Sequence, residues 1–144
     1  VRKNKVKEIG CRDTKGNYFE INLTEDGKND PIFNGLNNKL NIFHLHGETV
    51  DLTKSIALLA TGRTCKNQAV KVGRNAYGLQ GHFELTEEKL RLWMFKDADL
   101  KKLDPNSVLK DYRALNTQLE SNARKILGNF LEIAKVIPLE AEQY

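Results

Sequence analysis

Residues 77–94 read YGLQGHFELTEEKLRLWM, and inside this stretch the pattern of a strand gives way to that of a helix. Residues 75–80 predict a strand that pairs with residues 68–72 as a hairpin, because Gly73 supplies the positive φ that a tight connection needs. Thr86 then predicts the N-cap of a helix whose first turn carries acidic residues, where the helix dipole favours negative charge. The stretch therefore predicts a chain that changes from strands to helices at this point.

The segments on either side follow the same division. Residues 17–23 alternate polar and apolar side chains, which is typical of a half-buried strand, and residues 40–46 and 55–61 predict further strands. Residues 108–137 carry apolar side chains at helical spacing, and Pro138 is expected to end that helix. No internal repeat or linker interrupts the sequence, so we expect a single α/β domain with short strands first and helices last.

Composition narrows the class of protein. The chain has 144 residues, of which 40% are hydrophobic and 29% charged, so disorder and fibrous structure are not expected. The 23 basic and 19 acidic residues are mixed along the chain, whereas a nucleic-acid-binding surface would typically show a basic stripe. No apolar run approaches the about 20 residues of a membrane span. We therefore expect neither nucleic acid nor a membrane as a partner.

The two cysteines point to a reducing compartment. Cys11 and Cys65 lie far apart in the sequence, with no CxxC motif and no set of four or six cysteines. Free thiols are typical of cytoplasmic proteins, so we expect a cytoplasmic location. The basic residues at 2–7, RKNKVK, are not followed by an apolar segment, so they do not form the pattern of a secretory signal. The chain begins with Val1 rather than Met.

His82 and Glu84 form the first candidate site. Side chains two residues apart on a strand point to the same face, about 6.6 Å apart along the backbone, so this carboxylate can reach this imidazole. A carboxylate bonded to one ring nitrogen sets the tautomer and leaves the other nitrogen to act as a base. The same spacing also fits a hydrogen-bonded surface pair without function, and the two residues alone do not decide between these interpretations.

The three histidines of the chain suggest a second interpretation. His44 and His46 would share one face of a strand, and with His82 and Glu84 they could supply three nitrogens and one oxygen. Such a set suits Zn²⁺ or non-haem iron. Two ordinary strand motifs would produce the same pattern, so a metal-binding domain stays one of three hypotheses.

A nucleophile to accompany His82 is missing from the sequence. A strained elbow of the G-x-C-x-G or G-x-S-x-G kind needs small residues around the reactive side chain. Neither Cys11, in EIGCRDT, nor Cys65, in GRTCKNQ, lies in such an elbow, and no serine does. Both cysteines are better interpreted as structural, so a base and its orienting acid stand without a nucleophile.

Five segments in order carry a family resemblance: VKEIG at 6–10, DPIFNGL at 30–36, FHLHGETVDL at 43–52, LLATGRTCKNQAV at 58–70 and YGLQGHFELTEEKLRLWM at 77–94. Together they resemble the C-terminal half of a class I glutamine amidotransferase domain, of the kind found in GMP synthase. The resemblance implies the C-terminal part of a three-layer, flavodoxin-like α/β domain. It also implies that residues 97–144 form a helical C-terminal extension like that of stand-alone members.

The resemblance assigns roles to five residues. It implies hydrolysis of glutamine to glutamate and ammonia by a Cys-His-Glu triad, with His82 as the base and Glu84 as the residue that orients it. His46 and Gly47 would lie beside the glutamine pocket, with Glu48 where Asp is more usual. No cofactor and no metal are implied.

The chain departs from the family pattern in ways that keep a second hypothesis open. Gly81 stands where Phe is usual and Phe83 where Pro is common, and the resemblance implies no role for His44. The half of the family domain that carries the cysteine elbow is not matched. We expect the nucleophile upstream of Val1, and we expect that upstream half and a synthetase subunit to be partners. A non-catalytic amidotransferase-like binding module is the alternative.

Overall fold

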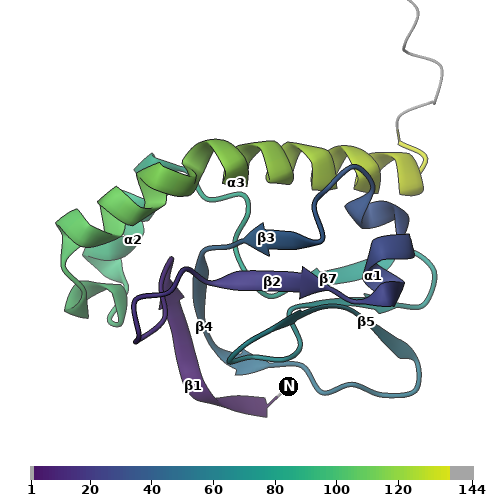
Figure 1. Ribbon diagram of the computed structural model, residues 1–144, viewed down its shortest axis with the longest axis horizontal. Helices are drawn as coiled ribbons and strands as arrows, with labels where there is room; N and C mark the ends of the chain where they lie inside the picture. The colour runs from purple at the N-terminus through teal and green to yellow at the C-terminus, as the bar shows by residue number, and fades with distance from the viewer. Residues whose placement is uncertain (1, 137–144) are drawn as a thin grey trace, which may run out of the picture.

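The computed structural model describes residues 2–136, and in that part of the chain strands precede the longer helices (Figure 1). The strands are β1 (Arg2–Gly10), β2 (Glu20–Leu23), β3 (Lys39–Asn41), β4 (His44–Thr49), β5 (Ile56–Gly62), β6 (Ala69–Val72) and β7 (Ala76–Leu79). The helices are α1 (Glu25–Asn29), α2 (Glu87–Lys96) and α3 (Pro105–Ile133), with 3₁₀ turns η1 (Pro31–Phe33) and η2 (Leu100–Lys102). The predicted order of short strands followed by helices is confirmed.

The larger sheet is antiparallel and runs in the order β3, β2, β5, β6, β7. Its last two strands form the predicted hairpin, in which Val72 pairs with Ala76. The connection has three residues rather than the expected two, and Gly73 adopts φ +61° there. This conformation is one that a side chain with a Cβ seldom adopts, so the glycine is required by the turn.

A second, smaller sheet pairs β1 with β4, and here the sequence prediction was wrong. The single strand expected over 40–46 is divided into β3 and β4, which belong to different sheets. Ile42 and Phe43 connect them and are fully buried. Two adjacent buried side chains break the alternation of a strand, and the chain uses this point to pass from one sheet to the other.

The starts of α2 and α3 are set by N-cap side chains. Thr86 caps α2 by accepting a hydrogen bond from the backbone N–H of Lys89, as predicted. Asp104 caps α3 by accepting from the N–H of Ser107, and Pro105 occupies the first turn, where its missing N–H costs nothing. The start expected at residue 108 is therefore three residues too late.

The end of α3 differs more clearly from expectation. The helix ends at Ile133, and Lys135 follows with φ +57°, in a left-handed conformation that stops further helical hydrogen bonds. Ile137 and Pro138, the expected end and stop signal, lie outside the described residues. The terminus is thus set earlier, by the backbone after Ala134.

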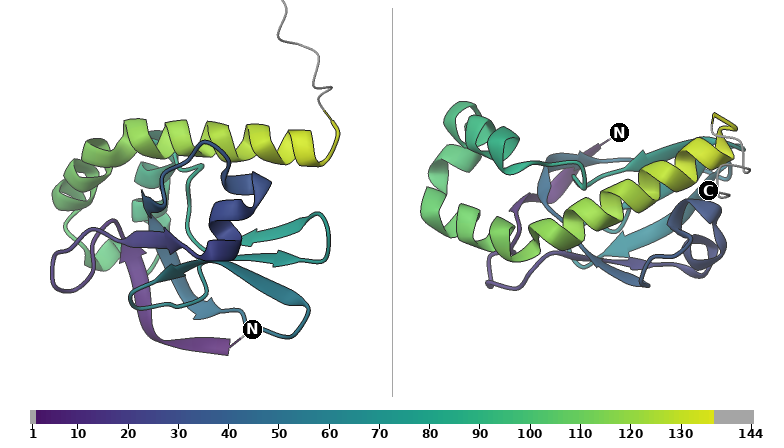
Figure 2. Two further views of the ribbon diagram at one scale, coloured as in Figure 1. Left: turned by 45° about the vertical axis from the view of Figure 1, so that its right-hand side comes forward. Right: turned by 90° about the horizontal axis from the view of Figure 1, so that it is seen from above.

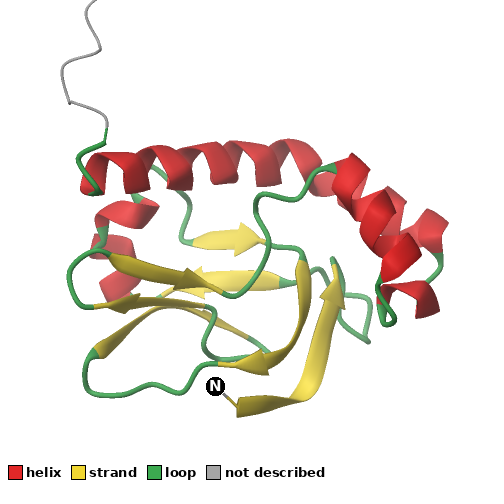
Figure 3. Cartoon of the chain, turned by 180° about the vertical axis from the view of Figure 1, so that it is seen from behind, coloured by secondary structure: helices red, strands yellow, loops and turns green. Residues whose placement is uncertain are grey.

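The core lies between α3 and the strands, with α3 extending along one side of the fold (Figures 2 and 3). Leu115, Leu119 and Ile126 project from one face of α3 and are buried, Leu119 completely. Asn129 extends this contact because its amide donates to the carbonyls of Ile32 and Asn34, at 2.9 Å each. Removing a buried leucine side chain of this kind costs about 2–5 kcal/mol, so α3 is a main support of the sheet.

The predicted extension 97–144 includes η2 and α3 as far as it is described. Its standing as an extension beyond the domain stays a prediction, as does the treatment of the chain as one domain. None of the helices within residues 2–136 combines the length and the apolar character that crossing a bilayer requires.

Candidate active site

His82 and Glu84 are hydrogen-bonded, as their spacing predicts. The distance from His82 Nδ1 to Glu84 Oε1 is 2.8 Å. An ionised carboxylate can only accept, so Nδ1 carries the proton, and Nε2 of the neutral ring presents a lone pair. The His82 side chain is 29% exposed and that of Glu84 62%, so a reacting group could approach this imidazole.

The backbone and one aromatic ring position His82. Its N–H donates to the carbonyl of Phe43 at 2.8 Å, which ties it to the start of β4. Just before it, the N–H of Gln80 donates to the carbonyl of Gln68 at 2.8 Å, at the edge of β6. The imidazole packs edge-on against Trp93 of α2, with ring centroids 5.0 Å apart. Contacts with Phe43, Gln68 and Trp93, which are distant in sequence, therefore hold His82 and the backbone before it in place.

Gly81 lies where the neighbouring side chains leave no room for a larger residue. A Cβ placed here would lie 2.3 Å from Cγ1 of Ile42 and 3.0 Å from Nδ1 of His44. The space that a larger side chain would need is already filled by Ile42. Phe83, the other residue that differs from the expected motif, is buried in the core.

A largely apolar groove begins at His82. It has a volume of about 480 Å³ and lies between the end of β7 and α3. Its lining includes Tyr77, Leu79, His82, Leu127 and Phe130, of which Leu79, Leu127 and Phe130 are exposed apolar side chains. His82 thus borders a cavity rather than open solvent alone.

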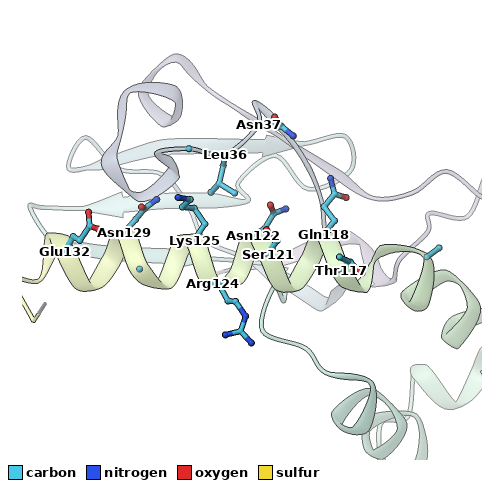
Figure 4. A pocket seen from close by; sticks show the side chains of 13 residues that line it. Leu36, Asn37, Thr117, Gln118, Ser121, Asn122, Arg124, Lys125, Asn129 and Glu132 are labelled. Atoms are coloured by element: carbon cyan, nitrogen blue, oxygen red, sulfur yellow. The ribbon is translucent and has the colours of Figure 1, made fainter. Parts of the chain in front are cut away.

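A second hollow, of about 810 Å³, lies between residues 35–37 and α3 (Figure 4). Asn37, Gln118 and Lys125 are among the polar side chains that line it. None of the residues predicted for the site lines this hollow, so it is not part of the arrangement around His82.

The other predicted pocket residues lie on β4 and point in different directions. The His46 side chain is only 7% exposed and faces inward, with Nε2 2.9 Å from Oε2 of Glu8. Gly47 packs beside Lys7, to whose Cγ an added Cβ would be 3.1 Å, and Glu48 is exposed. Any substrate contact here would therefore come from the backbone or from Glu48, not from the His46 ring.

Glu8 is the residue that sequence reasoning missed. Its Oε1 accepts from the N–H of Cys65 at 3.2 Å and its Oε2 from Nε2 of Gln68 at 2.9 Å. Burial raises the pKa of the Glu8 carboxyl, but the neighbouring His46 and His44 rings and these amide donors outweigh it and hold the pKa below its usual value. An acidic residue within β1 has no local signal of this kind, because its partners come from strands far along the chain.

His44 completes this buried cluster. Its side chain is 1% exposed, and its Nε2 lies 3.7 Å from Oε2 of Glu8. Burial lowers the pKa of His44 to about 4, despite the nearby Glu8 carboxylate, so the ring is neutral at pH 7. Within residues 2–136, Glu8, His44 and His46 are the group whose possible ligand atoms lie within 4.8 Å of one another. The expected set of His44, His46, His82 and Glu84 is not brought together.

Neither cysteine has the surroundings of a nucleophile. Cys11 and Cys65 are both buried and unbridged. Burial raises the pKa of Cys11 to about 12, with Asp111 adding to the effect, so its thiol stays protonated. Cys65 Sγ donates to the hydroxyl of Thr49 at 3.2 Å. The thiolate is the reactive form, so Cys11 is not suited to act as a nucleophile.

Comparisons with known proteins agree with this geometry. No protein-family model matches the chain, and no curated protein matches it in sequence. Among solved structures, it is similar to a glutamine amidotransferase from Thermotoga maritima with a TM-score of 0.74 and 25% identity, over 91% of this chain and 54% of that one. SMU.1228c gives a TM-score of 0.71 and 26% identity, over 91% and 53%.

A third structure supports the fold alone. It is described as a putative GMP synthase subunit from Thermoplasma acidophilum, with a TM-score of 0.57 and 20% identity, and the match covers 94% of this chain and 48% of that one. The chain spans about half the length of each of these three proteins. The predicted α/β class is therefore confirmed, and the fold of the chain is similar to about half of a glutamine amidotransferase structure.

Proposed function

We propose that this chain supplies the base and its orienting acid for the hydrolysis of glutamine to glutamate and ammonia. The single observation that carries the proposal is the 2.8 Å hydrogen bond between His82 and Glu84 at the mouth of a groove. Similarity to glutamine amidotransferase structures supports the reaction class. The cysteine nucleophile comes from outside residues 1–144.

The proposed reaction uses His82 twice. Its Nε2 takes the proton of the cysteine thiol, and the thiolate attacks the side-chain amide carbon of glutamine. The imidazolium returns the proton to the leaving nitrogen, which departs as ammonia and leaves a thioester. Water then attacks the thioester, with His82 accepting its proton, and glutamate and the free thiol are formed. Glu84 holds Nδ1–H throughout and stabilises the imidazolium.

The packing around His82 suits this role. Its backbone bond to Phe43 and its contact with Trp93 restrict the ring to one orientation, so little freedom is lost when substrate binds. Gly47 and Glu48 lie on β4, a few residues beyond the point where Phe43 pairs with His82. We assign to Gly47 and Glu48 contacts with the main-chain atoms of the substrate glutamine. We assign to His46, whose side chain is buried, the positioning of this segment of β4.

The same proposal names the partners. The segment with the nucleophile would pack beside the exposed pair, and a synthetase subunit would receive the ammonia. Two buried free thiols support a cytoplasmic location.

The test is ammonia release from glutamine by the full-length protein of the reading frame. We expect His82→Gln to reduce kcat by at least about 10³-fold and Glu84→Gln to reduce it less, because loss of a triad base is among the most damaging changes. Glu88→Gln, which removes another exposed carboxylate, is the matched control and should retain full turnover. Undiminished turnover by His82→Gln would rule out the assigned base.

The alternative is a binding module without activity, which the Gly81 and Phe83 departures favour. A glutamine analogue with an electrophilic ketone separates the two. The enzyme hypothesis expects covalent labelling of one cysteine other than Cys11 and Cys65, located by mass spectrometry. A full-length protein that acquires no label and releases no ammonia would establish the binding module.

A further inference from the structure

Glu8, His44 and His46 converge because of the register between β1 and β4. In this antiparallel pair, Glu8 lies opposite His46 and Gly10 lies opposite His44. Residues two apart on β4 share a face, so both imidazoles point toward the same carboxylate. All three side chains are more than nine-tenths buried, at 2%, 1% and 7% exposure. The groups are therefore held together by the sheet, and water is largely excluded from them.

The hydrogen bonds of His46 leave a ring nitrogen unexplained. Its Nδ1 lies 3.1 Å from the carbonyl oxygen of Glu48, which can only accept, so Nδ1 carries the proton. Nε2 then faces the Glu8 carboxylate, with 2.9 Å between Nε2 and Oε2. Buried Nε2 makes no hydrogen bond of ordinary geometry with any of the described residues. Two acceptor atoms that face each other in a buried site repel unless a proton or a metal ion lies between them.

We propose that Glu8, His44 and His46 bind one divalent first-row transition ion, such as Zn²⁺, through two imidazole nitrogens and a carboxylate oxygen. Two histidines and one carboxylate are a ligand set that zinc and non-haem iron both use. Their ligand atoms lie within 4.8 Å of one another, so a small rearrangement brings all three onto one ion. The site is separate from the His82–Glu84 pair, and the inference does not depend on the proposed function.

The surroundings of the cluster resemble the outer shell of a metal site. Histidine ligands usually donate their second N–H to a carbonyl or a carboxylate, as His46 does to Glu48. The Glu8 carboxylate is likewise oriented by Cys65 N–H and Gln68.

One of the three ligands, Glu8, borders open space inside the fold. Glu8 is among the residues that line two small cavities, of about 280 Å³ and 230 Å³. Asp13 also lines both cavities, and its carboxylate pairs with Arg63 at 3.2 Å. Three protein ligands leave a fourth coordination position free, the arrangement of an open zinc site.

The test is titration of the chelator-treated chain with Co²⁺, followed by its visible d–d absorbance, and then competition with Zn²⁺. We expect one equivalent of Co²⁺ to bind and one equivalent of Zn²⁺ to displace it. Glu8→Gln and His46→Gln should each weaken binding by more than about 100-fold, since loss of an outer partner alone costs about 10- to 100-fold. His82→Gln, which removes the exposed histidine, is the control and should bind as the parent does.

Circular dichroism verifies that each variant folds, and His44→Gln provides a third ligand variant if one of the others does not fold. Failure of the parent chain to bind one equivalent of either metal would overturn the proposal. So would ¹⁵N chemical shifts showing both nitrogens of His46 protonated at pH 7, because an imidazolium paired with Glu8 would then replace the ion. Loss of binding in His82→Gln alone would also refute the assignment.

Discussion

The molecule contains two groupings of histidine and glutamate, and their surroundings make them chemically different. Glu8, His44 and His46 are buried between β1 and β4, whereas His82 and Glu84 lie at an exposed edge beside a groove. The buried group can hold an ion or support the fold, because no substrate-sized molecule can reach it. The exposed pair can meet a substrate but contributes little to stability, since exposed ion pairs are worth about 0–1 kcal/mol.

The two groups are nevertheless neighbours through the backbone. Phe43, which precedes His44, accepts the hydrogen bond from the N–H of His82. Gly81, which precedes His82, leaves room for Ile42 and approaches His44. The buried group therefore supports the segment on which the exposed pair lies, and separate substitutions should tell the two contributions apart.

The largest difference in the free energy of unfolding is expected between substitutions of Glu8 and of Glu84. Glu8→Ala removes the acceptor for Cys65 N–H and Gln68 Nε2 in the core, and we expect it to lower the free energy of unfolding by about 3–5 kcal/mol. Glu84→Ala should change it by no more than about 0.5 kcal/mol, because this side chain is exposed. Urea denaturation at pH 7 with chelator present measures both. Equal losses of unfolding free energy in the two variants would contradict the distinction between the buried and the exposed group.

Substitution of Gly81, which lies between the two groups, should lower the free energy of unfolding by an intermediate amount. Gly81→Ala places a methyl group against Ile42, and such overpacking costs about 1–3 kcal/mol. Ile42→Ala in the same chain removes the collision, so the double variant should lose less than the sum of the two single variants. A thermodynamic cycle from urea denaturation measures this coupling, and strictly additive losses would show that Ile42 does not occupy the site.

The smallest effect is expected at an exposed carboxylate away from both groups. Arg113 and Arg91 bond to Glu87 and lower its pKa to about 2, from an ordinary value of 4.5. A lowered pKa gives stability that is fully present above pH 4.5 and is lost as pH falls toward 2. Glu87→Gln should therefore be less stable than the parent at neutral pH, with a difference that shrinks through this range. Unfolding curves at several pH values measure it, and a constant difference would contradict the assignment.

Features that depend on near neighbours were predictable. The β6–β7 hairpin, the Thr86 cap and the His82–Glu84 hydrogen bond each involve residues a few positions apart. The division of residues 40–46 between two sheets was not predictable, because it depends on which partner strands are available. The end of α3 was also missed, since the left-handed residue Lys135 carries no composition signal comparable to glycine.

The sequence by itself determined the class of fold, the succession of strands and helices, and the exposed pair, because spacing along a strand or helix decides which side chains meet locally. Only the tertiary structure decided that Glu8 would join His44 and His46 and that the His46 ring would face inward. The pairing of β1 with β4 joins residues almost forty positions apart, and a shift of one residue in that register would turn every side chain to the other face. No local pattern encodes that register, so the buried cluster emerges only when the sheet is formed.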